Sequence, residues 1–197
     1  SLRENKVMSL KTRFGNLGNI LDFDNLTEEN IYVLDSPILT NSQFKKFKKF
    51  FSKKVKIIDC TFDIKSSLKD RIEAIREESE TAVREGSTCL ILSDKNISNL
   101  KASIPSILTV GAVHSHLVKH GLRGYCSLNV ECSDALDTHA FAVLIGVGAT
   151  TVNPYLAIDS IYQRFEKKLF GKSDFETCVV KFKKSIDAGL LKIMSKM

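Results

Sequence analysis

The sequence contains no apolar run as long as the roughly 18 residues that a membrane-spanning helix needs. Its longest apolar segment, residues 139–152, is interrupted by Gly146 and Gly148. The N-terminal region has no apolar signal core, and the five cysteines are odd in number and scattered, unlike those of a disulfide framework. We therefore expect a cytoplasmic protein that does not enter a membrane and whose cysteines are reduced structural thiols.

Arginine clusters of the kind that contact base edges are also lacking, although the net charge is +6. Much of that charge lies in residues 44–56, FKKFKKFFSKKVK, which hold seven lysines and no acid. Phe44, Phe47 and Phe51 recur at helical spacing, which places the rings on one face of a helix and the lysines on the other. We interpret this segment as a solvated surface helix and expect no nucleic-acid partner.

Short apolar strands alternate with helices from residue 55 onwards, after a first helix that opens at Thr40 or Asn41. The predicted strands are 55–60, 88–94, 125–131 and 149–154. The predicted helices are 66–85, 105–120, 134–147, 155–170 and 174–194. Continuously apolar strands favour parallel pairing in a sheet covered on both faces, with right-handed crossovers. The expected fold class is α/β: parallel βα units in one partial (β/α) barrel-like domain or a small open sheet.

The length of 197 residues, 43% of them hydrophobic, allows one domain with a packed core and an arm. Residues 1–35 show no regular pattern, and Pro37 biases Ser36 away from helix. We therefore divide the chain into an extended N-terminal arm or linker, residues 1–40, and an α/β domain, residues 41–197.

The segment HAFAVLIGVGATTVNPYLA, residues 139–157, is either a ligand-binding corner or the packed joint between a helix and a strand. Gly146 or Gly148 permits a positive φ or a close helix–strand approach. Asn153 is expected to cap the next helix, with Pro154 at its first position. Because the proline removes a donor and no basic residue is adjacent, phosphate binding is disfavoured and we interpret the segment as a packed joint.

Three sets of residues are weak candidates for ligand binding. His116 and His120 share a helix face, as zinc ligands would, but no glutamate follows the first and no carboxylate stands near them in sequence. Cys126 and Cys132 supply at most two of the four ligands of a cluster. The glycines at Gly15 and Gly18 do not form G-x-G-x-x-G after a strand. We predict surface histidines near a helix C-terminus, structural thiols and no metal-binding residues.

Asp59, Asp94 and Glu131 lie at or near the ends of three predicted strands, where a (β/α) barrel carries its active site. Acids at strand ends are also common turn and cap residues, and no nucleophile–base pair accompanies these three. Two interpretations stay open. The chain is a free-standing α/β enzyme or phosphate-ligand-binding domain with its site at the strand ends, or it is not catalytic by itself.

Long phrases of the sequence resemble the central domain of the large subunit of bacterial glutamate synthase, the glutamine:2-oxoglutarate amidotransferase family. The phrases, in chain order, are ENKVMSLKTRFGNLGNIL (4–21), DSPILTNSQF (35–44), IDCTFD (58–63), REGSTCLILSDK (84–95), IPSILTVGAVHSHLVKHGLR (104–123), THAFAVLIGVGATTVNPYLA (138–157) and IDAGLLKIMSKM (186–197). The resemblance covers essentially the whole chain.

The resemblance implies a domain within a multidomain flavoenzyme. Its partners would be an amidotransferase that releases ammonia from glutamine and a barrel that binds FMN and an iron–sulfur cluster, where 2-oxoglutarate and ammonia become glutamate. A small NAD(P)H-oxidising subunit would complete the holoenzyme. The family's cluster cysteines are spaced C-x5-C-x4-C; Cys126 and Cys132 match the first spacing, but Asp137 stands at the third position. The resemblance therefore implies no catalytic, cofactor-binding or metal-binding residue in this chain.

The resemblance also suggests a use for the arm, since a segment between a glutaminase and a synthase is well placed to line their shared ammonia tunnel. The candidates for tunnel or interface residues are Met8, Ser9, Leu10, Lys11, Ser36, Pro37, Ile38, Leu39 and Thr40. Small and apolar side chains suit a passage that carries neutral ammonia and excludes bulk water. The alternative is that the arm simply packs on the sheet.

Overall fold

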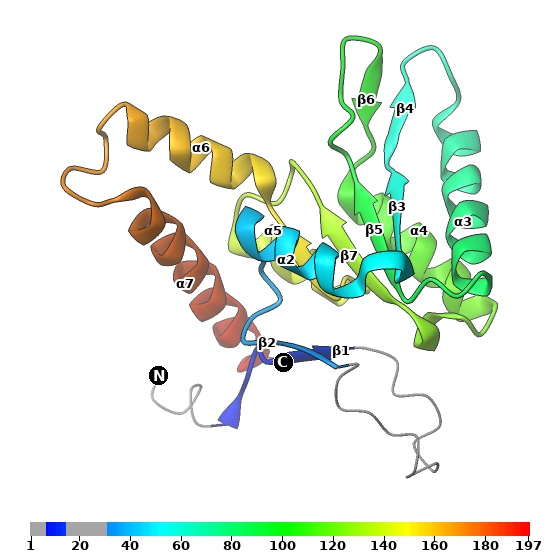
Figure 1. The fold of residues 1–197 in the computed structure, drawn as a ribbon, viewed down its shortest axis with the longest axis horizontal. Coiled ribbons are helices and arrows are strands. Elements are labelled where there is room, and N and C mark those ends of the chain that lie inside the picture. Colours follow the sequence, from blue (N-terminus) through cyan, green and yellow to red (C-terminus); the bar gives the residue numbers. More distant parts are fainter. Residues whose placement is uncertain (1–6, 15–30) are drawn as a thin grey trace.

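The computed structural model describes residues 7–14 and 31–197 and is built around a four-stranded parallel sheet (Figure 1). The strands, in spatial order, are β3 (Val55–Asp59), β5 (Cys89–Ser93), β7 (Ser127–Glu131) and β8 (Thr151–Asn153). Neighbours in the sheet follow one another along the chain, as they do in a (β/α) barrel. The predicted fold class, α/β with parallel βα units, is confirmed.

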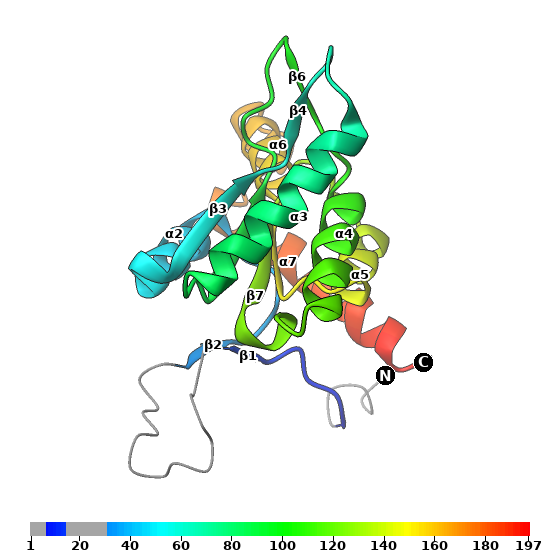
Figure 2. The ribbon, with the colours of Figure 1, turned by 90° about the vertical axis from the view of Figure 1, so that its right-hand side faces the viewer.

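Helices cover both faces of this sheet (Figure 2). The helices are α2 (Asn41–Phe51), α3 (Leu68–Arg84), α4 (Ser106–Lys119), α5 (Thr138–Gly146), α6 (Tyr155–Glu166) and α7 (Phe175–Met194). Short 3-10 turns, η3 (Ser52–Lys54) and η4 (Arg123–Tyr125), precede β3 and β7. Because successive crossovers of one hand return to the same side, α3, α4 and α5 lie together on one face, and α2 lies on the other. Helix α7 packs against α5 and α6.

The central strands divide the core by their period of two. In β5, Cys89 and Ile91 face the α2 side, and Leu90 and Leu92 face the α3–α5 side. All five residues of β5 and all five of β7 are buried, although Ser127, Asn129 and Glu131 of β7 are polar. The rings of α2 on the predicted face, Phe44, Phe47 and Phe51, are buried against the sheet. The lysine-rich segment is thus a helix with its rings buried as far as Phe51, and its remaining residues form η3 and the start of β3.

Local signals set the starts of three helices. Thr40 Oγ1 accepts from the backbone N–H of Gln43 at 3.3 Å, and the Gln43 side chain accepts from Thr40 N at 3.1 Å, which completes a capping box. Ser67 caps α3 and Asp174 caps α7 through their side-chain oxygens. Thr40 is one of the two residues at which α2 was predicted to open. The predicted Asn153 cap is wrong, because the Asn153 amide donates instead to the Leu39 carbonyl at 2.9 Å.

The predicted joint after α5 is packed as expected. Gly148 has φ +122°, its N–H donates to Ile145 O at 3.1 Å, and Ala149 N donates to Leu144 O at 2.9 Å. This pair of hydrogen bonds is a Schellman C-cap. A Cβ at Gly148 would lie 2.3 Å from Nδ1 of His114 on α4. Of the two glycines considered, Gly148 therefore provides both the positive φ and the close approach.

Two short strand pairs were not predicted. β4 (Thr61–Asp63) continues beyond β3 and pairs antiparallel with β6 (Lys101–Ser103), which forms a projection at the carboxyl end of the sheet (Figure 1). β1 (Thr12–Phe14) pairs antiparallel with β2 (Tyr32–Leu34) at the opposite end. In the described residues, no helix is both long and apolar enough to cross a bilayer.

Candidate functional site

The predicted arm joins the edge of the sheet. Ile38 forms a parallel bridge with Val152 of β8, Leu39 N donates to Val152 O at 2.9 Å, and Val152 N donates to Pro37 O at 2.9 Å. Residues 37–39 therefore act as a short fifth strand beside β8. For this part of the arm, packing on the sheet is what the structure shows.

The nine candidate tunnel or interface residues fall into two classes. Ser36, Pro37, Ile38 and Leu39 are buried within the domain, and Thr40 is half-buried at the start of α2. Met8 and Leu10 are half-buried, and Ser9 and Lys11 are exposed. Ser36–Leu39 are held by this domain itself, and Leu10 packs against its core. Met8, Ser9, Lys11 and Thr40 keep part or all of their surface exposed. Whether any of them lines a passage stays a prediction.

A buried polar cluster fixes the turn into the arm strand. The Ser36 hydroxyl donates to Asp187 Oδ1 of α7 at 2.6 Å and accepts from Ile38 N at 3.1 Å. Burial raises the pKa of Asp187 and lowers the pKa of the neighbouring Lys183. Ser36 and Asp187 thereby tie the N-terminal segment to the last helix.

Glu131, at the end of β7, is a buried carboxylate with several partners. Its side chain lies 2.9 Å from Lys95 Nζ and 3.6 Å from Lys48 Nζ, and the Ser93 hydroxyl donates to it at 2.7 Å. Charged and hydrogen-bonding partners are what permit an ionised group to be buried. This predicted strand-end acid is therefore held in an internal ion-pair network.

Asp94, which follows β5, lies beside this network. Its Oδ2 atom accepts from the backbone N and hydroxyl of Ser133, at 3.0 and 2.6 Å, and from the Ser103 hydroxyl at 3.1 Å. Its Oδ1 atom is buried with no hydrogen-bond partner in the described part of the chain. Burial, followed by the Asp94 carboxylate, raises the pKa of Tyr155 at the start of α6.

Asp59, at the end of β3, has a separate set of partners. Thr61 donates to its Oδ1 from the backbone at 3.0 Å and from the hydroxyl at 2.7 Å, and Lys101 lies 3.7 Å from its Oδ2. Burial acts to raise the pKa of Asp59, but these hydrogen bonds, one from Asn96 and the Lys101 charge outweigh it and lower the pKa. The three acids thus lie at one edge of the sheet, each with its own donors.

The cysteines do not fit an iron–sulfur cluster. Cys126 and Cys132 flank the five residues of β7, so six steps of about 3.3 Å each separate them by about 20 Å. Both are buried, and burial raises the pKa of each thiol. The prediction of structural thiols agrees with this placement.

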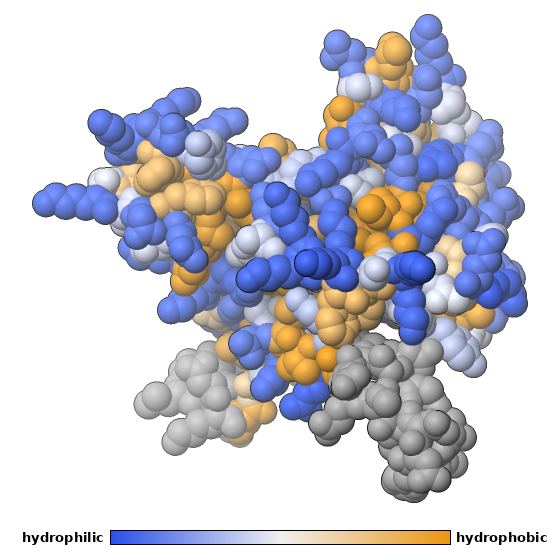
Figure 3. Space-filling model, in the orientation of Figure 1, coloured by the Kyte–Doolittle hydropathy of each residue, from blue (hydrophilic) through white to orange (hydrophobic). Residues whose placement is uncertain are grey.

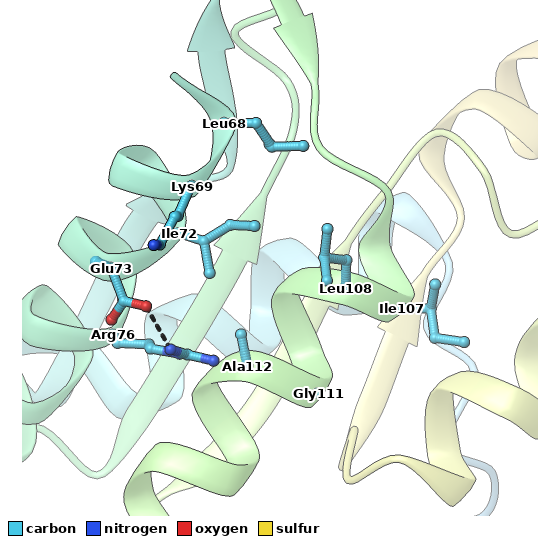
Figure 4. A pocket seen from close by; sticks show the side chains of 9 residues that line it. All are labelled: Leu68, Lys69, Ile72, Glu73, Arg76, Ile107, Leu108, Gly111 and Ala112. Carbon is cyan, nitrogen blue, oxygen red and sulfur yellow. Dashed lines mark hydrogen bonds and ion pairs between the residues drawn. The ribbon is translucent and has the colours of Figure 1, made fainter. Parts of the chain in front are cut away.

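Sequence spacing missed an apolar groove between α3 and α4 (Figure 4). Leu68 and Ile72 of α3 and Leu108 of α4 point toward the same hollow, and Ile107 lies at its rim. The hollow has a volume of about 620 Å³. Ile107 and Leu108 are 46% and 40% exposed, which is a large apolar surface for adjacent residues of a helix. Helical periodicity places residues on one face but does not say whether that face is covered.

A second apolar hollow lies between α6 and α7. Figure 3 shows hydrophobic side chains at the surface over this helix pair, with hydrophilic side chains around them. Its apolar lining residues are Leu136, Ala157, Ile161, Phe170, Cys178 and Phe182. Surfaces of this kind mark contacts with other proteins or domains.

The histidines separate into two environments. His114 accepts a hydrogen bond from Arg123 Nε at 3.2 Å beneath the packed joint. His116 of α4 and His120, the C-cap residue of that helix, instead face Glu80 of α3, with His116 Nε2 2.7 Å from Glu80 Oε2. The fold therefore supplies the carboxylate that the two histidines lack in their own part of the sequence.

Comparison with known proteins identifies relatives across the whole chain. A family described as the glutamate synthase central domain matches residues 1–197. The large chain of the NADPH-dependent glutamate synthase of Azospirillum brasilense is 50% identical over 200 residues, and that of Bacillus subtilis is 38% identical over 205 residues. The chloroplastic ferredoxin-dependent glutamate synthase of Spinacia oleracea is 36% identical over 211 residues.

These matches use 100% of this chain but 13% of the length of each of the three relatives. The chain is therefore similar to one domain of much longer proteins. Because the family matches residues 1–197 and the relatives match the whole chain, the chain belongs to the glutamate synthase central domain family.

Proposed function

We propose that the chain is the central, non-catalytic domain of a glutamate synthase large subunit, an oxidoreductase of ammonia assimilation and glutamate biosynthesis. The observation that carries this proposal is the identity of 50% over the whole chain to a relative of which the chain represents 13%. In this role the domain links a glutaminase domain to an FMN-binding synthase domain. FMN and an iron–sulfur cluster would be bound by other domains of the same polypeptide, and a small NAD(P)H-oxidising subunit would be a further partner.

Two features of the surface support a linking role. The groove between α3 and α4 and the hollow between α6 and α7 both expose apolar side chains. The two helix pairs lie at the right and the left of the view in Figure 1. Interfaces between domains of one chain need such surfaces, because burying apolar area stabilises the contact by about 25 cal/mol per Å². Each hollow is proposed as a contact for a neighbouring domain.

Guidance of ammonia is the finer part of the proposal. Ser36–Leu39 are rigidly held, so they would act by fixing the path of the arm rather than by moving. Ser9 is exposed, and its one described contact is the hydrogen bond that it accepts from Lys11 N at 3.1 Å. Substitution of Ser9 should therefore disturb this domain least among the candidates. If Ser9 lines a shared passage, a larger side chain there should obstruct it.

The alternative is a free-standing enzyme or phosphate-ligand binder at the strand ends. It is less well supported, because Asp59, Asp94 and Glu131 each already hold hydrogen-bond donors or lysines of this domain. A phosphate placed there would meet three carboxylates. We assign these acids to stabilising the strand ends.

The test uses Ser9→Trp in the protein at its natural length. A bulky ring at a passage should lower glutamine-dependent glutamate synthesis several-fold and release free ammonia, while synthesis from added ammonia persists. Asn99→Trp is the matched control, because Asn99 is equally exposed in the loop before β6, at the other end of the molecule. Unchanged coupling between glutamine consumed and glutamate formed in the Ser9 variant would contradict the guiding role. No glutamate synthase activity in the natural protein would contradict the proposal as a whole.

A further inference from the structure

The side chains of Glu80, His116 and His120 meet between α3 and α4. His116 Nε2 lies 2.7 Å from Glu80 Oε2, and His120 Nδ1 lies 3.5 Å from Glu80 Oε1. The two imidazole rings have centroids 4.4 Å apart. One ligand-type atom from each residue lies within 4.8 Å of the other two.

This geometry is close to that of a tetrahedral metal site. Imidazole nitrogen and carboxylate oxygen are suitable ligands for zinc and similar ions. With metal–ligand bonds of about 2.0–2.1 Å, ligand atoms at the corners of a tetrahedron are about 3.3 Å apart. The separations of 2.7 Å from His116 to Glu80 Oε2 and 3.5 Å from His120 to Glu80 Oε1 lie on either side of that spacing, although they end on different oxygens of the carboxylate. Small side-chain rotations would therefore complete three corners around one ion.

We propose that Glu80, His116 and His120 bind one divalent transition-metal ion of the zinc type, with a fourth position left for water. His116 and His120 are four apart on α4, and Glu80 comes from the neighbouring helix. The ion would thereby cross-link α3 to α4, the two helices that also form the apolar groove. This inference does not depend on the proposed function.

Arg84 competes with a metal ion for Glu80, because its Nε donates to Glu80 Oε1 at 2.8 Å. The Arg84 side chain is 56% exposed and forms no part of the core, so it can turn away when a cation arrives.

The alternative is that these residues form an ion-pair and hydrogen-bond network and nothing more. The two possibilities differ in the effect of Arg84. If the cluster is an ion-pair network, removing Arg84 changes no metal affinity. If the cluster is a metal site, removing Arg84 frees a ligand oxygen and tightens binding.

The experiment is equilibrium dialysis of the natural-length protein against radioactive zinc, with far-UV circular dichroism to check folding. The double variant His116→Gln, His120→Gln should bind one zinc ion fewer per chain than the wild type, or bind it at least about tenfold more weakly. His139→Gln is the control, because His139 is exposed on α5, outside the cluster, and should leave zinc binding unchanged. Arg84→Gln should raise the affinity.

Equal zinc content and affinity in the wild type and the double variant would overturn the proposal. So would an Arg84→Gln variant that binds zinc no more tightly than the wild type. The second variant keeps all three ligands, so it remains informative if the double variant does not fold. Zinc stoichiometry is measured without reference to glutamate synthesis, so its failure is distinct from failure of the proposed function.

Discussion

Gly148→Ala is expected to destabilise the domain strongly, although it adds one methyl group. The backbone at Gly148 has φ +122°, a conformation that costs a residue with a Cβ about 1–3 kcal/mol. The new Cβ would also lie 2.3 Å from His114 Nδ1, so the ring must move. Moving it breaks the 3.2 Å hydrogen bond from Arg123 Nε, which contributes about 0.5–1.5 kcal/mol. Together the loss should be about 1.5–4.5 kcal/mol.

The assay is urea unfolding of the 197-residue chain, followed by circular dichroism. Gly146→Ala is the matched control, because Gly146 lies within α5 and an added Cβ there meets nothing within 4 Å. That change should stabilise the chain by about 0.5–1 kcal/mol, as alanine is the better helix former. In a His114→Ala background the steric part should vanish, and Gly148→Ala should cost about 1–3 kcal/mol. A Gly148 variant as stable as the wild type would refute the reasoning.

Two further predictions concern polar contacts. Thr151→Val should lower the free energy of unfolding by about 1–3 kcal/mol, because Thr151 Oγ1 donates at 2.7 Å to the buried Asn129 Oδ1, which would lose that partner. Thr109→Val is the comparison, since the Thr109 hydroxyl donates to a helix carbonyl. It should lower the free energy of unfolding by less in the same urea titration. Asp174→Ala should lower the melting temperature near neutral pH, since Thr177 N–H and then its hydroxyl hold the pKa of Asp174 below its usual 3.8. A carboxyl group whose pKa is lower in the folded state stabilises the fold at pH values above its unfolded-state pKa. That stabilisation is lost as the pH falls through its folded-state pKa. The gap between the two melting curves should therefore close below about pH 4, and a gap that does not depend on pH would count against the cap.

The helix caps and turns that depend on residues close together in the sequence could be predicted from local signals. The cap at Thr40 needs Gln43, and the Schellman turn at Gly148 needs α5, so both could be predicted from a few adjacent residues. The parallel sheet could be predicted too, because β5 is apolar from Cys89 to Leu92 and strands alternate with helices along the chain. The α/β class followed from the apolar strands and their alternation with helices.

Contacts between distant segments could not be predicted in this way. Asn153 looked like a helix cap, but the Leu39 carbonyl, 114 positions away, takes its amide hydrogen. β4 and β6 carry too few apolar residues for a strand pattern, so their pairing was not visible. Glu80 meets His116 across 36 positions, and no spacing rule joins them. The candidate residues of the arm came from family resemblance, because their own side chains carry no chemical signature.

The strand formed by residues 37–39 imposes an order on folding during translation. Its hydrogen-bonding partner, Val152, is made 114 residues after Ile38. At about 5–20 residues per second, the ribosome needs several seconds to supply that partner. The phenylalanine face of α2 also stays uncovered until β5 has been synthesised, because it packs on Cys89 and Ile91 of that strand. High contact order therefore makes closure of this edge a late event, and the N-terminal third of the chain is the part that chaperones would have to protect.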